Sequence, residues 1–276
     1  MAAPIWGAFV KYRKTLTMTV FNRPAYLRKV LGALSRCLGI ERYRLVICAE
    51  PGCDEVLELV RAVTFAPVEV VLNKEVLTCP VNVYQALRQA FLETDFNIHL
   101  EDDILLWKDA LTYFEHCRKA YQDDRNVFTV TAYNNQASGP KERYGLARRA
   151  WFTPWAWATW ADRFEEMRPH WDFNYAKGNW DHNLNTAVRG ERVEVFPILA
   201  RAQNIGLTGV HVPSEQWGKA FHYNEFWAGK VNPAGDQDWR ERPDWTWEPF
   251  QAKPEDLKGI PGEWLKALGV PVEGEK

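Results

Sequence analysis

Three consecutive acids, Glu101, Asp102 and Asp103, follow a short apolar run and are followed at once by further apolar residues. The apolar run predicts a buried strand, and ionised carboxylates at the end of such a strand are costly unless they are paired or bound to a cation. Mg²⁺ and Mn²⁺ prefer carboxylate and phosphate oxygens, and commonly take one or two protein carboxylates together with substrate phosphates. The segment therefore predicts a site for a divalent cation and a diphosphate. The alternative is a solvated acidic turn before a helix, where acids are also favoured.

Polar residues also follow two other strands that we expect in this half of the chain. Apolar runs bounded by turn residues predict strands, and apolar residues at helical spacing predict helices between them. The expected strands span 16–21, 43–49, 68–72 and 96–100, and the expected helices span 25–37, 54–63 and 80–92. This alternation is typical of an α/β fold with a mostly parallel sheet, in which ligands bind at the carboxyl ends of the strands. Asn22 and Arg23 follow the first strand and Glu50 follows the second, so we expect them to meet the acids at one edge.

The rest of the chain continues this pattern less regularly. The expected helices span 110–121, 161–167 and 179–188, and the expected strands span 127–132 and 193–198. Residues 151–160 carry four tryptophans, with Trp155 and Trp157 expected on one face of a strand. We expect at least half of the four to be core and the others to offer a flat platform to a ligand. After residue 226 the periodicity fades except for a short helix at 263–268, which predicts an irregular segment that packs on the core.

The composition is that of an ordinary globular protein. The 276 residues are 46% hydrophobic and carry a formal net charge of -2, so no long-range attraction to nucleic acid or to an anionic membrane is expected. The start of the chain lacks the pattern of a signal peptide, and no apolar run is long enough to cross a membrane. The five cysteines include no CxxC pair, which favours buried thiols in a reducing compartment. We therefore expect a cytoplasmic protein.

The order of these segments resembles that of GT-A-fold glycosyltransferases, and the later segments resemble those of the N-acetylglucosaminyltransferase I-like group and of related bacterial and phage sugar transferases. The matching segments are Asn22-Arg23-Pro24, Glu101-Asp102-Asp103, Thr131-Ala132-Tyr133-Asn134, Phe152-Thr153-Pro154-Trp155-Ala156-Trp157, Trp180-Asp181, Asn204-Ile205-Gly206 and Gly209-Val210-His211. The resemblance implies a Rossmann-like sheet flanked by helices, in a single GT-A domain over residues 1–225. Within it, residues 15–105 would form the nucleotide-binding half and 106–225 the acceptor half, with 226–276 as a C-terminal tail.

The resemblance also implies that the protein binds a nucleoside-diphosphate sugar together with Mn²⁺ or Mg²⁺. Asp103, the last of the acids, would ligate the cation, and His211 would join it or close over the diphosphate. Asp102 would face the ribose or a cation-bound water, and Glu101 would face the donor sugar or the base. The alternative for Glu101 is a structural ion pair with a nearby arginine, because perturbed acids are also found in such pairs. The alternative for His211 is a solvated loop residue.

Further residues would complete the donor site. Arg23, beside Asn22, matches an arginine that lies near the diphosphate in the family, and the guanidinium fork suits phosphate. The alternative is a surface arginine next to a turn proline. Glu50 stands where the family often has an aspartate that contacts uracil, which leaves the identity of the base open. Asn82 falls near a ribose-contacting histidine of the family, and the alternative is a residue near a helix start with no ligand contact.

Asp181 is the candidate general base. The Trp180-Asp181 pair matches the base segment of the family. An inverting transfer needs a carboxylate that takes the acceptor proton while the hydroxyl attacks. The alternative is that Asp181 only caps the helix that follows, which is a common use of aspartate. Asp162, Glu215 and Glu225 are reserve candidates.

These observations predict a metal-dependent inverting glycosyltransferase that moves a hexosyl or N-acetylhexosaminyl group from a UDP-sugar to an acceptor hydroxyl. The acceptor would be a glycan or a hydroxymethylated base of phage DNA, in a bacterium or a phage-infected cell, and no membrane partner is expected. One alternative is a nucleotidyltransferase-like enzyme acting on a sugar phosphate, although the first strand does not end in a glycine-rich phosphate loop. Another is a non-catalytic carbohydrate-binding protein, which would explain the tryptophans but does not need the acids.

Overall fold

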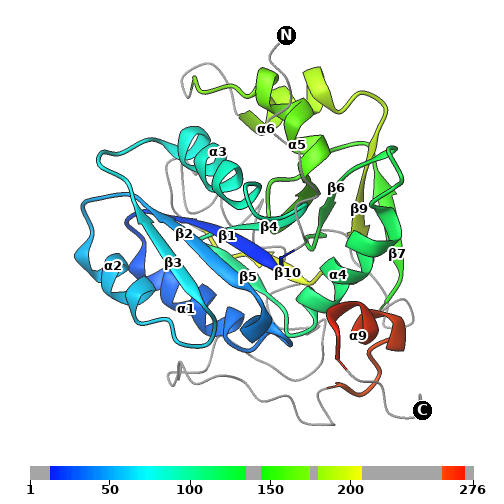
Figure 1. Ribbon diagram of the computed structural model, residues 1–276, viewed down its shortest axis with the longest axis horizontal. Coiled ribbons are helices and arrows are strands. Elements are labelled where there is room, and N and C mark those ends of the chain that lie inside the picture. The colour runs from blue at the N-terminus through cyan, green and yellow to red at the C-terminus, as the bar shows by residue number, and fades with distance from the viewer. Residues whose placement is uncertain (1–12, 135–143, 175–179, 207–256, 271–276) are drawn as a thin grey trace.

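The computed structural model describes residues 13–134, 144–174, 180–206 and 257–270 of the chain. The described part is built on an eight-stranded sheet in the order β3-β2-β1-β4-β8-β6-β9-β7 (Figure 1). β8 pairs antiparallel with β4 and β6, and β7 pairs antiparallel with β9, whereas the other neighbours are parallel. The predicted mostly parallel sheet is therefore confirmed. Its strands are β1 (Thr15–Val20), β2 (Arg44–Ala49), β3 (Val68–Leu72), β4 (Phe96–Glu101), β6 (Val127–Thr131), β7 (Leu146–Arg149), β8 (Trp157–Trp160) and β9 (Val193–Pro197).

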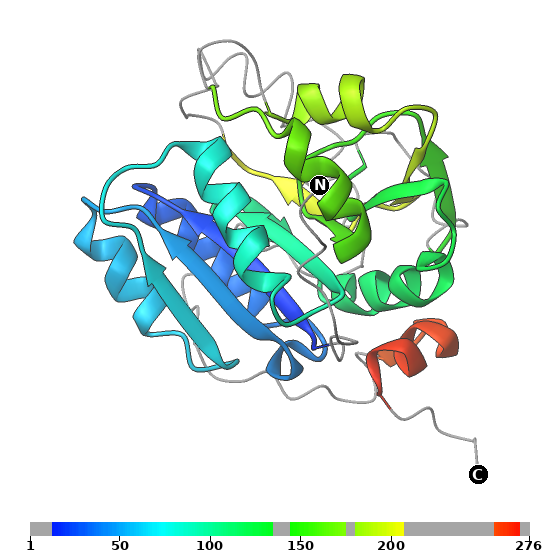
Figure 2. The same ribbon diagram turned by 45° about the horizontal axis from the view of Figure 1, so that its top comes forward.

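Helices cover both faces of this sheet (Figures 1 and 2). One apolar core joins Leu16, Met18 and Val20 of β1 to buried side chains of α1, α2, α4 and α9, and a second gathers around Trp157 with side chains of α3, α5 and α6. Within the described residues, the helices are α1 (Pro24–Leu34), α2 (Asp54–Arg61), α3 (Cys79–Ala90), α4 (Ala110–Tyr121), α5 (Ala161–Met167), α6 (Trp180–Asn183) and α9 (Gly262–Leu268), with the 3-10 turns η1 (Ile40–Arg42) and η3 (Arg168–His170) and the π-helical turn η4 (Leu184–Val188). None of them is long and apolar enough to cross a membrane.

Three short strands were not predicted. β5 (Ile104–Leu106) follows the acids directly and pairs antiparallel with β10 (Ala202–Asn204), in a small sheet of its own. β7 lies at the edge of the main sheet. Strands of three or four residues are too short to show a clear alternation of apolar and polar residues. The pairing of β5 with β10 nevertheless matters for the site, because β10 leads directly to Gly206 beside the acids.

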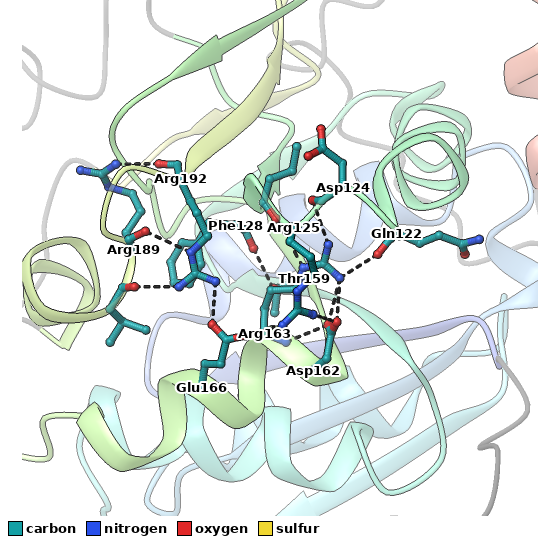
Figure 3. Close-up of polar contacts among 12 residues, drawn as sticks. Gln122, Asp124, Arg125, Phe128, Thr159, Asp162, Arg163, Glu166, Arg189 and Arg192 are labelled. Atoms are coloured by element: carbon teal, nitrogen blue, oxygen red, sulfur yellow. Dashed lines mark hydrogen bonds and ion pairs between the residues drawn. The ribbon is translucent and has the colours of Figure 1, made fainter.

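A buried arginine of α5 holds the chain at the amino end of β6 (Figure 3). This end of the sheet is opposite to the carboxyl end of β4, because β4 and β6 both pair antiparallel with β8. Arg163 is 1% exposed, and its guanidinium donates to backbone carbonyls of residues 121–127 and to the carboxylate of Asp162. The carbonyl acceptors are those of Gln122 at 2.9 Å, Asp124 at 3.1 Å, Tyr121 at 3.2 Å and Val127 at 3.4 Å. Asp162, a reserve candidate for the base, therefore belongs to a structural cluster far along the sheet from the acids.

The C-terminal helix α9 packs against α4. The ring of Trp264 lies against the rings of Tyr113 and His116, with centroid distances of 5.6 Å to each. The guanidinium of Arg201 lies 4.7 Å from the Trp264 ring centroid, and Arg42 donates to the carbonyl of Gly269 at 2.6 Å. Residues 257–270 are thus held to the core by ring contacts and by a capped helix end.

Candidate functional site

Arg23 joins the carboxyl ends of two neighbouring parallel strands. It follows β1, and its guanidinium reaches the acids that follow β4. Its Nη1 donates to Oδ2 of Asp103 at 2.7 Å, and its Nη2 donates to Oδ1 of Asp102 in a short contact. Burial lowers the pKa of Arg23, but the charges of Asp103 and Asp102 outweigh it and raise the pKa above its ordinary value. The predicted convergence of the first and fourth strand ends is present in the structure.

The acids repel one another. Burial, followed by the charge of Asp103, raises the pKa of Glu101 to about 8, although Arg23 opposes this. Burial also raises the pKa of Asp102 to about 6, despite its contact with Arg23. Asp181 of α6 adds to the rise in the pKa of Glu101, so its carboxylate lies within electrostatic range of the acids. One arginine does not offset this concentration of negative charge, and a divalent cation would.

The residues present fit such a cation. Oδ1 of Asp103 is fully buried and has no hydrogen-bond partner among the described residues. An unmatched buried carboxylate oxygen is what a hard cation needs as a ligand, and Mg²⁺ or Mn²⁺ takes its remaining ligands from phosphates and water. In the described part of the chain no group of three or more His, Cys, Asp or Glu side chains forms a site from protein atoms alone. His211, the second predicted ligand, lies outside the described residues.

Gly206 supports this arrangement of Asp103. A Cβ atom at residue 206 would stand 2.3 Å from Oδ2 of Asp103, so a larger residue would displace the carboxylate. The backbone N–H of Ile205 also donates to the carbonyl of Asp103 at 2.9 Å. The Asn204-Ile205-Gly206 segment, which the sequence analysis identified only by resemblance, therefore holds the last acid in place.

Glu50 and Asn82 lie in a buried polar network beneath the end of β2. Glu50 accepts through Oε2 from the backbone N–H of Leu77 at 3.0 Å and from Nδ2 of Asn73 at 3.2 Å. The same Nδ2 donates to Oδ1 of Asn82 at 3.0 Å, and Asn82 donates to the carbonyl of Cys48 at 3.3 Å. Asn73 was missed by the sequence analysis, although it directly follows β3 at the same edge of the sheet. Asn22, by contrast, is exposed.

Asp181 lies in the first turn of α6. The side chain of its neighbour Trp180 forms a hydrogen bond with the thiol of Cys79, and Sγ of Cys79 lies 4.0 Å from Oε1 of Glu101. Burial raises the pKa of the Cys79 thiol well above its ordinary value. The start of α3 and the start of α6 thus meet beside Glu101 through Cys79 and Trp180.

The tryptophans divide between core and surface. Trp157 and Trp160 are buried, whereas Trp151 is 48% exposed and faces the ring of His182 at a centroid distance of 6.0 Å. Trp155 packs edge-on against Tyr133. The prediction that Trp155 and Trp157 share a strand face is wrong, because β8 begins at Trp157 and the residue before it, Ala156, has a φ of 44°.

Part of the chain matches a known protein family. Residues 80–221, just over half of the chain, match the GNT-I family. The chain belongs to the GNT-I family. This confirms the predicted resemblance to the N-acetylglucosaminyltransferase I-like group. The matched residues contain the three acids, the Trp180-Asp181 pair and the Asn204-Ile205-Gly206 segment, and they exclude Arg23 and Glu50.

Solved structures share the fold of this GNT-I family member at low sequence identity. A crystal structure of S. aureus TarS 1-349 aligns with a TM-score of 0.51 and 14% identity, over 68% of this chain and 59% of that one. The same TarS fragment in complex with UDP-GlcNAc aligns with a TM-score of 0.50 and 13% identity, over 68% of this chain and 57% of that one. The chain thus spans less than two thirds of these structures. The likeness confirms the GT-A type of α/β fold.

Proposed function

We propose that this protein transfers a sugar from a nucleoside-diphosphate sugar, with uridine as the nucleoside, to an acceptor hydroxyl, with inversion at the anomeric carbon and with the help of Mn²⁺ or Mg²⁺. The observation that carries the proposal is the contact of Arg23 with Asp102 and Asp103 at the carboxyl ends of β1 and β4, with Asp181 within electrostatic range of Glu101. Membership of the GNT-I family supports it, as does the likeness to a TarS structure that holds UDP-GlcNAc.

At the donor end, Asp103 would hold the cation through its buried Oδ1, and Arg23 would donate to the diphosphate. The bound cation would neutralise the charge that develops on the departing diphosphate. The guanidinium of Arg23 already lies at the acids with its two Nη atoms on separate carboxylates, so its fork is directed into the site. Glu101 and Asp102 would face the donor sugar and the ribose.

At the acceptor end, Asp181 would act as the general base. The acceptor oxygen attacks the anomeric carbon, the bond from that carbon to the diphosphate oxygen breaks, and the proton of the hydroxyl passes to the Asp181 carboxylate. Attack from the side opposite to the leaving group inverts the anomeric configuration. The charge of Asp181 contributes to the raised pKa of Glu101, and this electrostatic influence supports the role because a base must act beside the donor sugar.

A glycan acceptor fits this surface better than DNA does. Trp151 is exposed beside His182, the residue next to Asp181, and an exposed indole suits the flat face of a sugar ring. Arg148 and Arg149 are adjacent arginines that could attract a nucleic acid, but both are engaged with acids of this chain. Arg149 donates to Oε1 of buried Glu194 at 2.7 Å, and Arg148 pairs with Asp124 at 3.3 Å.

Asp181→Asn tests the proposal, since the amide has nearly the size and shape of the carboxylate but cannot take the acceptor proton. Release of UDP from UDP-sugars, measured with Mn²⁺ and an acceptor glycan panel, should fall by ~10²–10⁴-fold, and the melting temperature should stay unchanged. Full activity of Asp181→Asn would show that the residue is not the base. NMR of the product that shows a retained anomeric configuration would contradict the inverting mechanism, and failure of the wild type to bind any nucleoside diphosphate would contradict the proposed function as a whole.

A further inference from the structure

Asn73 occupies the centre of the polar network at the ends of β2 and β3. It is buried, its backbone N–H donates to the carbonyl of Ala49 at 2.9 Å, and its side-chain Nδ2 donates to Glu50 at 3.2 Å and to Asn82 at 3.0 Å. A side-chain amide nitrogen carries two hydrogens. Both are therefore committed, one to the carboxylate that follows β2 and one to the helix α3.

Glu50 is held by one oxygen only. Its Oε2 accepts from Asn73 and from the N–H of Leu77, and within the described residues Oε1 accepts no hydrogen bond. Glu50 is only 4% exposed, but its Oε1 is not fully buried. The small exposed area of the residue therefore includes this oxygen. No ion pair of Glu50 with a described residue offsets its burial. A nearly buried carboxylate with one open oxygen is costly unless a ligand supplies a donor.

We infer that Asn73 is a positioning residue for recognition of the nucleobase, an inference that rests on the proposed function. Asn73 and the Leu77 N–H fix Oε2 of Glu50, which leaves Oε1 directed to a ring N–H of the base. The imide N3–H of uracil offers such a donor, whereas N3 of cytosine carries a lone pair that a carboxylate repels. A hydrogen bond to an ionised carboxylate is stronger than one between neutral groups. A Glu50 side chain that rotated freely would lose this selectivity. The amide of Asn73 therefore maintains the selectivity by fixing the orientation of the Glu50 carboxylate, without contacting the base itself.

Binding of UDP and of N3-methyl-UDP, measured by calorimetry with Mn²⁺ present, tests the inference. The methyl group removes the N3–H donor and leaves the diphosphate unchanged. Wild-type protein should prefer UDP by roughly 10- to 100-fold, the range for a hydrogen bond to a charged group. Asn73→Ala should weaken UDP binding toward the level of N3-methyl-UDP and leave N3-methyl-UDP binding unchanged, so that the preference disappears.

Asn97→Ala is the matched control. Asn97 is also a buried amide of the same sheet, and it donates to Oγ1 of Thr17 at 2.8 Å. It should keep the full preference for UDP. Asn73→Ser serves if the alanine variant fails to fold, because one hydroxyl hydrogen cannot serve both Glu50 and Asn82, and it should lose much of the preference. An unchanged preference in the Asn73 variants, or an equal loss of both ligands, would show that Asn73 only supports the fold.

The outcomes separate this inference from the proposed function. Wild-type protein that binds neither UDP nor GDP, CDP or ADP would overturn the proposed function. Wild-type protein that binds UDP and N3-methyl-UDP equally would overturn the inference alone. A preference for GDP over UDP would show that Glu50 meets a different ring N–H, and it would overturn the assignment to uracil.

Discussion

Two arginines, Arg23 and Arg163, differ in the groups that surround them. Arg23 lies at the carboxyl ends of the parallel strands of the sheet, and Arg163 lies at the amino end of β6. Arg163 is nearly inaccessible, and four of its acceptors are backbone carbonyls (Figure 3). The side chain of Arg23 is 27% exposed, and both of its acceptors are carboxylates. Burial lowers the pKa of Arg163 to about 10, whereas the carboxylates raise the pKa of Arg23. The two arginines thus have the same chemistry in different settings.

The difference indicates which edge serves the fold and which serves a ligand. A backbone carbonyl cannot move away without a change in the local backbone conformation, so the acceptors of Arg163 stay in place as long as this region is folded. Side-chain carboxylates can exchange one cation for another, and Oδ1 of Asp103 is buried with no hydrogen-bond partner among the described residues even though Arg23 contacts Oδ2. We therefore expect changes at the Arg163 edge to act on stability, and changes at the Arg23 edge to act on binding and turnover.

The largest effect is expected from Asp103→Ala. Loss of the oxygen that would hold the cation should raise the energy of the transition state of the transfer by several kcal/mol, so turnover should fall by about 10³-fold or more. Mn²⁺ binding in the presence of UDP, followed by electron paramagnetic resonance, should disappear. The melting temperature should not fall, because the change removes one of several mutually repelling acids. A large loss of stability would show that Asp103, like Arg163, serves the fold. It would contradict the expectation that changes near Arg23 act on binding and turnover.

Arg163→Leu should have the next largest effect, and on stability alone. Four carbonyls lose a donor, and a buried polar group left without a partner costs about 1–3 kcal/mol, so we expect destabilisation by about 3–5 kcal/mol in urea unfolding. Turnover per folded molecule should be unchanged. Arg125→Leu is the control, since its side chain is 54% exposed and its pairs with Asp162 and Glu166 should contribute no more than about 1 kcal/mol. Equal effects of the two variants would contradict the role given to the carbonyls.

The two clusters also differ in what the sequence could predict. The acids were found because they follow an apolar run, and Glu50 and Arg23 because strand ends converge in a parallel sheet. Asn73 follows a predicted strand, so the same rule would have found it. Arg163 could not be found, because its acceptors are carbonyls some 40 positions away, and every residue has one. Likewise, nothing in three residues at 104–106 indicates that they pair with 202–204.

Arg23→Lys should have a smaller effect. Lysine keeps the charge but cannot donate to two groups through a planar fork. Affinity for UDP should fall by roughly 1.5–3 kcal/mol, the worth of a hydrogen bond to a charged group, and urea unfolding should be unaffected. Calorimetry measures the first and denaturation the second. A donor complex in which Arg23 points to solvent, with unchanged affinity in the lysine variant, would contradict its place at the diphosphate.

The last prediction concerns the dependence of stability on pH at the acids that follow β4. The pKa of Glu101 is raised to about 8 in the folded protein, above its ordinary 4.5, mainly by burial. Between these values the folded state binds more protons than the unfolded state, so the free energy of unfolding should fall as the pH rises from about 5 to 8. Glu101→Gln, which cannot ionise, should flatten this slope, and Mn²⁺ with UDP should raise the melting temperature more at pH 8 than at pH 6 because the cation replaces the proton. An equally steep slope in Glu101→Gln would show that another group causes the pH dependence of the free energy of unfolding. The acids would then be no more unfavourable to the folded state than the groups around Arg163.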